Sequence, residues 1–324
     1  MGTPSFAVVP LSRLLEEKFE IAAVVTAPDK PSGRGLSLNS SEVKKFAIAN
    51  NLPVLQPVSL RDPVFLGELS LYQADLFIVV AFRMLPEVVW SMPPLGTFNL
   101  HASLLPRYRG AAPINWAIIR GEKVTGVTTF MLDKEIDTGD ILFRQECPID
   151  DNDDFGTLHD KLAEIGASLV VKSAEAITQG LVKTVGQSVL ESKIGNIPSA
   201  PKLTKESGKI DWKESGESVR NLVRGLSPYP GAHSRLTDRV QSADINRDIK
   251  GEQSVDVKIF RCIVTDKKST VNPGTILVDA GKRLFVACRD YYLEITELQM
   301  SGKRRMTAEE LLRGFRNIEK FKFV

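Results

Sequence analysis

Residues 96–120 decide the fold; they read GTFNLHASLLPRYRGAAPINWAIIR. Residues 96–101 are predicted to form a strand, and residues 112–120 a helix with Ile114, Ala117 and Ile118 on one side. The polar loop between them begins at the carboxyl end of the strand, which is the edge where open α/β sheets bind ligands. The segment therefore predicts an α/β domain with a site at the start of this loop.

The chain before this segment alternates between short apolar runs and helix-like stretches. Strands are predicted at residues 21–27, 54–55 and 75–82, and helices at residues 41–50 and 61–71. This β-α-β rhythm predicts a parallel sheet with helices on both faces. Gly2-Thr3-Pro4 has the composition of the turn that follows a first strand. Either that strand is missing, or translation starts upstream, where an in-frame apolar run of about five residues is expected.

The pattern changes from residue 124 onward. Two further strands (124–132 and 140–149) and a long amphipathic helix (157–179) are predicted, and around residues 189–209 Ser, Lys, Gly and Pro replace the periodic pattern. A short helix and several β-like segments follow, a spacing typical of a small β-barrel (219–225, 255–264, 274–278, 283–288 and 291–299). We predict a first domain at 1–188, a linker at 189–204 and a second domain at 205–324.

The composition is that of an ordinary globular protein, with 324 residues, 43% of them hydrophobic and 25% charged. There is no apolar run of about 18 residues, and the first residues lack the pattern of a signal peptide, so we expect a cytoplasmic protein. The three cysteines and three histidines have no paired ligand spacing. We therefore expect free thiols and no metal.

The net charge of +2 conceals an asymmetry along the chain. Residues 1–188 contain 17 basic and 22 acidic residues, a net charge of −5, whereas residues 189–324 contain 25 and 18, a net charge of +7. A basic half next to an acidic half favours contact between the second half and a polyanion. Many domains are mildly basic without binding nucleic acid, so the imbalance is weak support when taken alone.

Three polar side chains form a coherent set for acyl transfer to an amine. Asn99 and His101 project to the same side of one strand, and Asp137 lies on a glycine-containing turn downstream. An amide and an imidazole can donate hydrogen bonds to a carbonyl oxygen that becomes an oxyanion. A carboxylate favours the protonated imidazole and can accept a proton from the attacking nitrogen. Each residue also has an ordinary structural interpretation, as a buried histidine or a turn residue.

The run from Asn99 to Ile114 resembles the signature of the 10-formyltetrahydrofolate-dependent formyltransferases, which reads N-x-H-x-S-L-L-P-x-x-R-G-A-A-P-I. Further similar motifs lie along the whole chain: GTP at 2–4 with Phe6-Ala7, PDKPSGRG at 28–35, DTGD at 137–140, APKLTK at 200–205 and IDW at 210–212. The family fold implied is a Rossmann-like catalytic domain followed by an OB-like β-barrel. The branch that it most resembles formylates the free amino group of methionyl initiator tRNA.

The resemblance implies three sets of site residues. Asn99, His101 and Asp137 are implied to be catalytic, and the 10-formyltetrahydrofolate site is implied to be lined by Ser103, Leu104, Leu105 and Pro106. Arg34 falls in the loop that binds the tRNA acceptor in the family. Basic residues of the linker and the second domain are plausible further contacts to tRNA, although each could equally be a solvated surface residue: Lys202, Lys205 and Arg304. We expect a monomer.

Two other functions fit part of this pattern. A formyltransferase for a nucleotide-linked amino sugar or glycinamide ribonucleotide would share the three catalytic residues, but it would not explain the RGAAP run, the lysine-rich linker or the basic second half. A non-catalytic RNA-binding protein with a decayed first domain would not explain the intact Asn99, His101 and Asp137. A nucleotide-binding enzyme is disfavoured because G-x-G-x-x-G and Walker motifs are absent from the sequence.

Overall fold

The computed structural model describes residues 1–32, 37–192, 195–238, 254–315 and 317–324. Arg34, expected to contact tRNA, lies outside these residues. The chain forms two compact units, and each is made of more than one chain segment. The first unit comprises Met1–Pro113, Val124–Pro148 and His159–Pro201; the second comprises Ile114–Lys123, Ile149–Leu158 and Lys202–Val324.

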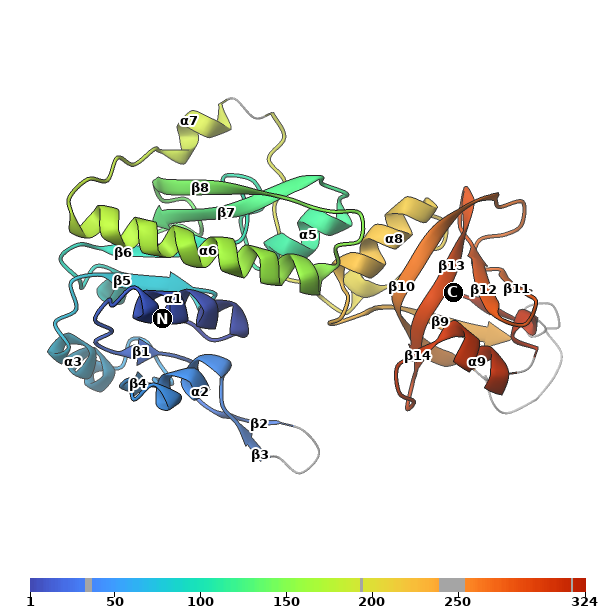
Figure 1. Ribbon diagram of the computed structural model, residues 1–324, viewed down its shortest axis with the longest axis horizontal. Helices are drawn as coiled ribbons and strands as arrows, with labels where there is room; N and C mark the ends of the chain where they lie inside the picture. The colour runs from blue at the N-terminus through green and yellow to red at the C-terminus, as the bar shows by residue number, and fades with distance from the viewer. Residues whose placement is uncertain (33–36, 193–194, 239–253, 316) are drawn as a thin grey trace. The chain divides into compact units, whose positions relative to one another are not determined.

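The first unit has the layered α/β arrangement that the sequence predicts, with helices packed on a sheet (Figure 1). Its elements are η1 (Ser5–Ala7), α1 (Val8–Glu16), β1 (Val24–Val25), β2 (Lys30–Ser32), β3 (Ser37–Asn39), α2 (Glu42–Ala49), β4 (Val54–Leu55), α3 (Pro63–Leu71), β5 (Phe77–Val80), α4 (Glu87–Trp90), β6 (Thr97–His101), β7 (Val124–Met131), β8 (Ile141–Pro148) and α7 (Gln187–Glu191). Two helices, α5 (Pro113–Ile119) and α6 (Phe155–Thr178), are divided between the units.

Parallel pairing holds for the strands before residue 120, where β1 pairs with β4 and β5 pairs with β6. The next two strands reverse the direction, since β7 is antiparallel to β6 and β8 is antiparallel to β7. The strand predicted at 21–27 is only Val24–Val25, because only these two residues find ladder partners on β4. The Rossmann-like class is confirmed, in a sheet of mixed direction.

Met1 and Gly2 lie between β1 and β5. The Gly2 N–H donates to the Val25 carbonyl oxygen at 3.0 Å, and the Val80 N–H donates to the Met1 carbonyl oxygen at 2.9 Å. A cavity of about 440 Å³ adjoins these residues, with Leu14 and Phe77 in its wall. Met1 and Gly2 thus join the edges of β1 and β5 at one end. Beside this junction, a cavity separates the two strands.

Local sequence signals explain where the helices start. The Ser41 hydroxyl caps α2 by accepting the Lys44 N–H at 3.1 Å, and Asp62 caps α3 just before a proline in the first turn. The long helix α6 runs along one face of the β5–β8 sheet (Figure 1). A Cβ atom on Gly166 of α6 would lie 2.7 Å from a methyl carbon of Leu100, so the glycine permits this close packing on β6.

The second unit is a small antiparallel β-barrel with helices packed on it. Its elements are η2 (Glu206–Gly208), α8 (Gly216–Gly225), β9 (Ala232–Asp238), β10 (Val255–Lys268), β11 (Ile276–Asp279), β12 (Arg283–Ala287), β13 (Tyr291–Met300), β14 (Met306–Thr307), α9 (Ala308–Gly314), η4 (Ile318–Lys320) and β15 (Phe321–Phe323). The strands follow the order β11-β12-β13-β10-β9-β15, and a bridge between Thr275 and Lys322 joins the two ends. The predicted barrel is confirmed as nearly closed.

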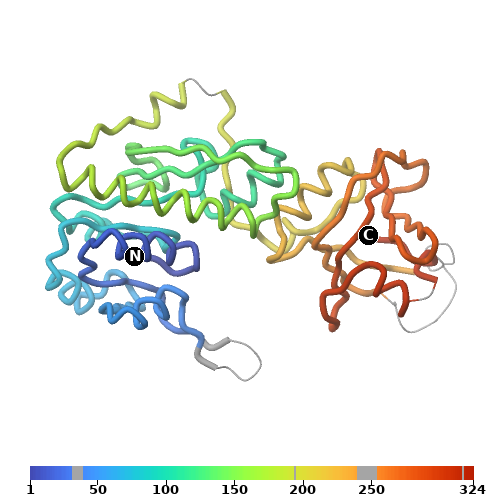
Figure 2. The backbone as a smooth tube through the Cα atoms, viewed as in Figure 1, coloured from blue at the N-terminus to red at the C-terminus, as the bar shows by residue number. Residues whose placement is uncertain are grey.

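After α6 the chain returns along the β8 side of the first unit (Figure 2). The Ile141 N–H of β8 donates to the Val185 carbonyl oxygen at 2.9 Å, and the reciprocal bond is also 2.9 Å. The same returning segment carries α7. In the part of the chain that the structure describes, no helix is long and apolar enough to cross a membrane.

Candidate active site

Asn99 and His101 lie on the face of β6 that is turned away from α6. Leu100 packs towards Gly166 of α6, and neighbouring side chains of a strand point to opposite faces. His101 is 7% exposed and Asn99 is half-buried. Among the described residues, the Asn99 side chain makes no hydrogen bond, so its amide is available to a ligand.

The imidazole of His101 is fixed through one nitrogen and faces an acid with the other. Its Nε2 lies 2.8 Å from the carbonyl oxygen of Tyr108, and its Nδ1 lies 3.7 Å from Oδ2 of Asp137. A carbonyl oxygen only accepts, so Nε2 must carry a hydrogen. The nitrogen that gains or loses a proton is therefore Nδ1, which faces the carboxylate.

Asp137 is held by the loop that contains Gly110. The Gly110 N–H donates to Oδ2 of Asp137 at 2.9 Å, whereas Oδ1 makes no hydrogen bond to a described residue. Gly110 has a φ of +120°, and a Cβ atom there would lie 2.5 Å from the carbonyl oxygen of Ala200. Only glycine fits this position, which brings its N–H to the carboxylate.

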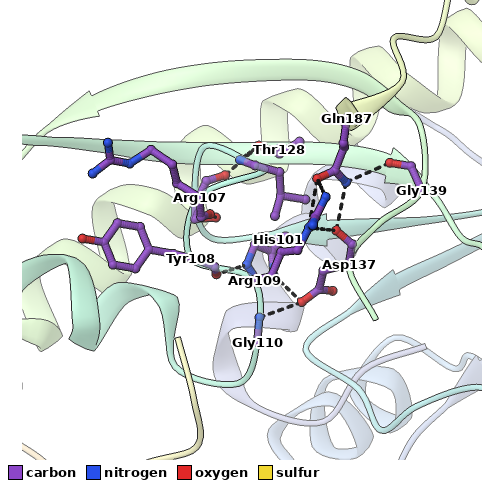
Figure 3. A network of polar contacts seen from close by, with 11 residues as sticks. His101, Arg107, Tyr108, Arg109, Gly110, Thr128, Asp137, Gly139 and Gln187 are labelled. Carbon is purple, nitrogen blue, oxygen red and sulfur yellow. Dashed lines mark hydrogen bonds and ion pairs between the residues drawn. The ribbon is translucent and has the colours of Figure 1, made fainter. Parts of the chain in front are cut away.

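Three side chains to which the sequence analysis gave no role surround the same loop: Arg109, Gln187 and Glu191. Figure 3 shows Arg109 and Gln187 converging on the backbone of Asp137. Gln187 is only 3% exposed although it lies in the short surface helix α7. Arg109 belongs to the RGAAP run of the signature, but neither periodicity nor motif spacing marks Gln187 and Glu191, whose partners lie about 50 to 80 positions away.

The four residues expected to line a folate site form a tightly packed turn. The Ser103 hydroxyl donates to the Arg107 carbonyl oxygen at 2.6 Å, and Leu105 packs in a small core with Phe130 and Ile141. Ser103, Leu105 and Pro106 are buried, and Leu104 is half-buried. Of the four side chains, only Leu104 keeps a substantial exposed surface for a ligand.

A cavity of about 460 Å³ lies near the loop that carries Asp137. Its wall includes Lys134 from that loop, together with Arg61, Met84 and Trp90. The walls thus combine two cations with apolar and aromatic side chains and with one carboxylate, that of Glu87, which lies 3.8 Å from Nζ of Lys134. No pattern in the sequence predicts this cavity, because it is built from segments that follow three different elements.

The remaining expected tRNA contacts are on the surface of the second unit. Lys202, Lys205 and Arg304 are all exposed, and Arg304 pairs with Glu310 at 2.7 Å. Of the three, Arg304 is therefore partly neutralised within its own unit. The two lysines make no ion pair with any described residue.

The described residues contain no cluster of three or more His, Cys, Asp or Glu side chains that could hold a metal ion. Cys147, Cys262 and Cys288 are buried thiols that take part in no disulfide. Burial raises the pKa of the Cys262 and Cys288 thiols to about 12, so both are protonated near neutral pH.

Comparisons with known proteins place both units in one family. A family model described as formyl transferase matches residues 1–174, and one described as formyl transferase, C-terminal domain, matches residues 202–316. WlaRD, a sugar 3N-formyl transferase, shares the fold at 21% identity with a TM-score of 0.60, covering 94% of this chain and 97% of that chain. HypX from Aquifex aeolicus, solved with tetrahydrofolic acid, gives a TM-score of 0.56 at 21% identity, covering 82% and 43%.

Sequence relatives are closer. The methionyl-tRNA formyltransferase of Bacteroides fragilis is 48% identical over 322 residues, which are 99% of this chain and 96% of the relative. That of Flavobacterium johnsoniae is 45% identical over 314 residues, covering 97% and 94%. Because this similarity extends over nearly the whole of both chains, the chain belongs to the methionyl-tRNA formyltransferase family.

Proposed function

We propose that Asn99, His101 and Asp137 are the groups with which this chain transfers a formyl group from 10-formyltetrahydrofolate to the free amino group of methionyl initiator tRNA. The reaction is that of its family, a one-carbon group transfer that prepares the tRNA for translation initiation. The observation that carries the substrate is 45–48% identity to methionyl-tRNA formyltransferases over nearly the full length. The roles of the residues rest on the 3.7 Å approach of His101 to Asp137.

The attacking group needs little activation. An aminoacyl α-amino group has a pKa near ~8 or below, so a useful fraction is neutral near pH 7. 10-Formyltetrahydrofolate supplies the formyl group, and the amine can attack it directly. The chain therefore needs no serine or cysteine nucleophile, and its task is to orient the two substrates and to manage charge and protons.

Asn99 and His101 stabilise the negative charge that develops on the formyl oxygen. The Asn99 amide is free to donate, and a protonated His101 donates through Nδ1 because Nε2 is occupied by the Tyr108 carbonyl oxygen. Removing one such donor typically costs about 100- to 1000-fold in kcat. The buried position of His101 strengthens this interaction, since it lowers the local dielectric constant.

Asp137 has two roles, one for each of its carboxylate oxygens. Oδ2, fixed by the Gly110 N–H, faces Nδ1 of His101 and favours the protonated imidazole. Oδ1 makes no hydrogen bond to a described residue, so it can accept the proton from the attacking nitrogen, directly or through a water molecule. A single carboxylate thereby serves both charge and proton transfer.

The 460 Å³ cavity is a candidate for the folate site by its size and chemistry, although none of the expected residues Ser103, Leu104, Leu105 and Pro106 lines it. Ligand pockets of about 300–1000 Å³ are typical for molecules of this size. Folates combine flat apolar rings with terminal carboxylates. Trp90, Met84 and Leu85 offer apolar walls, and Arg61 offers a cation for the carboxylates. Lys134 offers a second cation, which Glu87 of the same wall partly neutralises at 3.8 Å. Lys134 belongs to the loop of Asp137, so a folate bound here would lie next to the catalytic loop.

The tRNA would be held by its phosphates on the basic second unit. Residues 189–324 contribute a net charge of +7, and Lys202 and Lys205 are exposed and unpaired among the described residues. We also propose that the protein acts as a monomer in the cytoplasm. The assignment of the tRNA contacts rests on charge and exposure.

The reaction is tested by incubating purified protein with 10-formyltetrahydrofolate and one acceptor at a time. The acceptors are methionyl initiator tRNA, a nucleotide-linked amino sugar and glycinamide ribonucleotide. Transfer of the formyl group to the tRNA alone is the expected result. Formylation of the sugar or of the ribonucleotide without formylation of tRNA would overturn the proposed substrate.

A further inference from the structure

Asp137 occupies a backbone conformation that its surroundings must hold in place. Its φ is +58°, in the left-handed region that residues other than glycine rarely adopt. The loop around it is largely exposed at residues 133–136. A non-glycine residue in this region persists only when neighbouring contacts fix it. Contacts to the backbone of Asp137 therefore decide where its carboxylate points.

Two side chains provide these contacts. Nε of Arg109 and Nε2 of Gln187 each donate to the Asp137 carbonyl oxygen at 2.9 Å. Nε2 of Gln187 also donates to the Gly139 carbonyl oxygen at 2.9 Å. One amide thus ties together two carbonyls on either side of Thr138, and with them the turn that follows the catalytic acid (Figure 3).

The hydrogen-bonding capacity of Gln187 is completely used. Its NH₂ group makes the two bonds to the carbonyls, and its Oε1 accepts from Nε of Arg109 at 3.1 Å and from Nη2 of Arg109 at 2.6 Å. The reversed amide would place its NH₂ group against a guanidinium and its oxygen against two carbonyls. The partners therefore fix its orientation.

Arg109 is in turn fixed by α7. Its Nη2 lies 2.6 Å from Oε1 of Glu191, which is one helical turn beyond Gln187. Arg109 also immediately precedes Gly110, whose N–H holds the Asp137 carboxylate. The same network thus touches both the backbone and the side chain of the acid.

We propose that Gln187 and Arg109 are positioning residues for formyl transfer, which hold the Asp137 carboxylate at its place beside His101. This inference rests on the catalytic role proposed for Asp137. It gives a function to the segment that follows α6. By its sequence alone, this segment is a connection between domains. The two residues act through Asp137 and do not touch the substrates.

Gln187→Glu is the most informative variant. A glutamate keeps the shape and can still pair with Arg109, but it cannot donate to the two carbonyls. Misplacement of a catalytic group by about 1 Å can cost about 100-fold. We therefore expect kcat for methionyl initiator tRNA to fall by about 10- to 100-fold, while KM for tRNA and folate changes less than about twofold.

A double-mutant cycle separates positioning from general stability. Formyl transfer is measured in single turnover for wild type, Gln187→Glu, Asp137→Asn and the double variant. If Gln187 acts through Asp137, the double variant is no slower than Asp137→Asn alone. Val189→Ala, an exposed residue on the same short helix, serves as the control and should match wild type. Arg109→Lys, which keeps the charge, should lower kcat in the same direction if Gln187→Glu does not fold.

Two results would overturn the inference. One is a Gln187→Glu variant with the kcat of wild type while Asp137→Asn is inactive. This result would leave the catalytic role proposed for Asp137 intact. The other is a double variant whose loss of rate equals the product of the losses in Gln187→Glu and Asp137→Asn. Wild-type activity in Asp137→Asn itself would instead overturn the catalytic assignment on which the positioning role rests.

Discussion

Nε2 of His101 lies 2.8 Å from the carbonyl oxygen of Tyr108, and this contact decides which ring nitrogen carries the hydrogen of the neutral imidazole. The neutral imidazole must be the Nε2–H tautomer, and the second proton must add at Nδ1. With only three histidines in the chain, ¹⁵N NMR spectra of labelled protein can identify His101 by comparison with His101→Gln. We predict the Nε2–H pattern for the neutral ring. A spectrum of the Nδ1–H tautomer would contradict the proposed donor geometry.

Asn99 should matter for the chemical step and little for folding. Its amide has no partner among the described residues, so Asn99→Ala removes only the donor to the developing oxyanion. We predict that kcat falls by about 100- to 1000-fold, with the midpoint of thermal unfolding within a few degrees of wild type. Stopped assays of formyl-methionyl tRNA and calorimetry measure the two quantities. A loss below about tenfold would remove Asn99 from the catalytic set.

An ion pair at the end of β1 should make stability depend on pH. Nζ of Lys44 lies 2.6 Å from Oδ2 of Asp29, and Nε2 of Gln56 donates to Oδ1 at 2.9 Å. These hydrogen bonds hold the pKa of Asp29 below its ordinary value, and the bond from Lys44 has the larger effect. A lowered pKa in the folded state stabilises the protein above the unfolded-state value of about 3.9, and the contribution disappears as the pH falls through the folded-state value.

The comparison variant for this pair is Asp29→Asn. We predict that its free energy of unfolding in urea is lower than that of wild type by a constant amount between pH 5 and 8. The gap should shrink below about pH 4. A gap that grows on acidification would show that the sign of this linkage is wrong.

Lys202 and Lys205 should contribute to tRNA affinity through phosphates. Each phosphate contact that is lost lowers the slope of log affinity against log salt concentration by about one. We predict this change for Lys202→Ala and Lys205→Ala, and a smaller one for Arg304→Ala, because Glu310 already pairs with that guanidinium. Lys183→Ala, an equally exposed lysine of the first unit, is the control. Unchanged slopes for both lysines would place the tRNA elsewhere.

The sequence predicted the elements whose signals are local. The strand that ends at His101 and the helix capped by Ser41 could be placed because periodicity and capping are readable within one element. The helix α9 was missed although Thr307 and Glu310 form a capping box that the sequence displays. The strands β9 and β15 were missed because pairing with their partners fixes their extended conformation, with each other in both cases and with β10 in the case of β9.

The site was predictable only as far as its chemistry was concentrated in one motif. His101 and Asp137 were expected together and lie 3.7 Å apart. Gln187 could not be found, because a glutamine in a segment rich in polar residues carries no sign that tertiary contacts bury it. The cavity that includes Arg61 and Lys134 was missed for the same reason, since it exists only after distant segments meet.

The central claim is that Asp137 acts in the chemistry and not in tRNA binding. The most direct measurement compares wild type, Asp137→Asn and the control Asp140→Asn in single-turnover formylation of methionyl initiator tRNA, with retention of the tRNA on filters measured in parallel. We predict that Asp137→Asn loses at least about 100-fold in rate with nearly unchanged retention, whereas Asp140→Asn keeps both. A rate for Asp137→Asn within a few-fold of wild type, or a loss of tRNA retention equal to the loss of rate, would contradict the account.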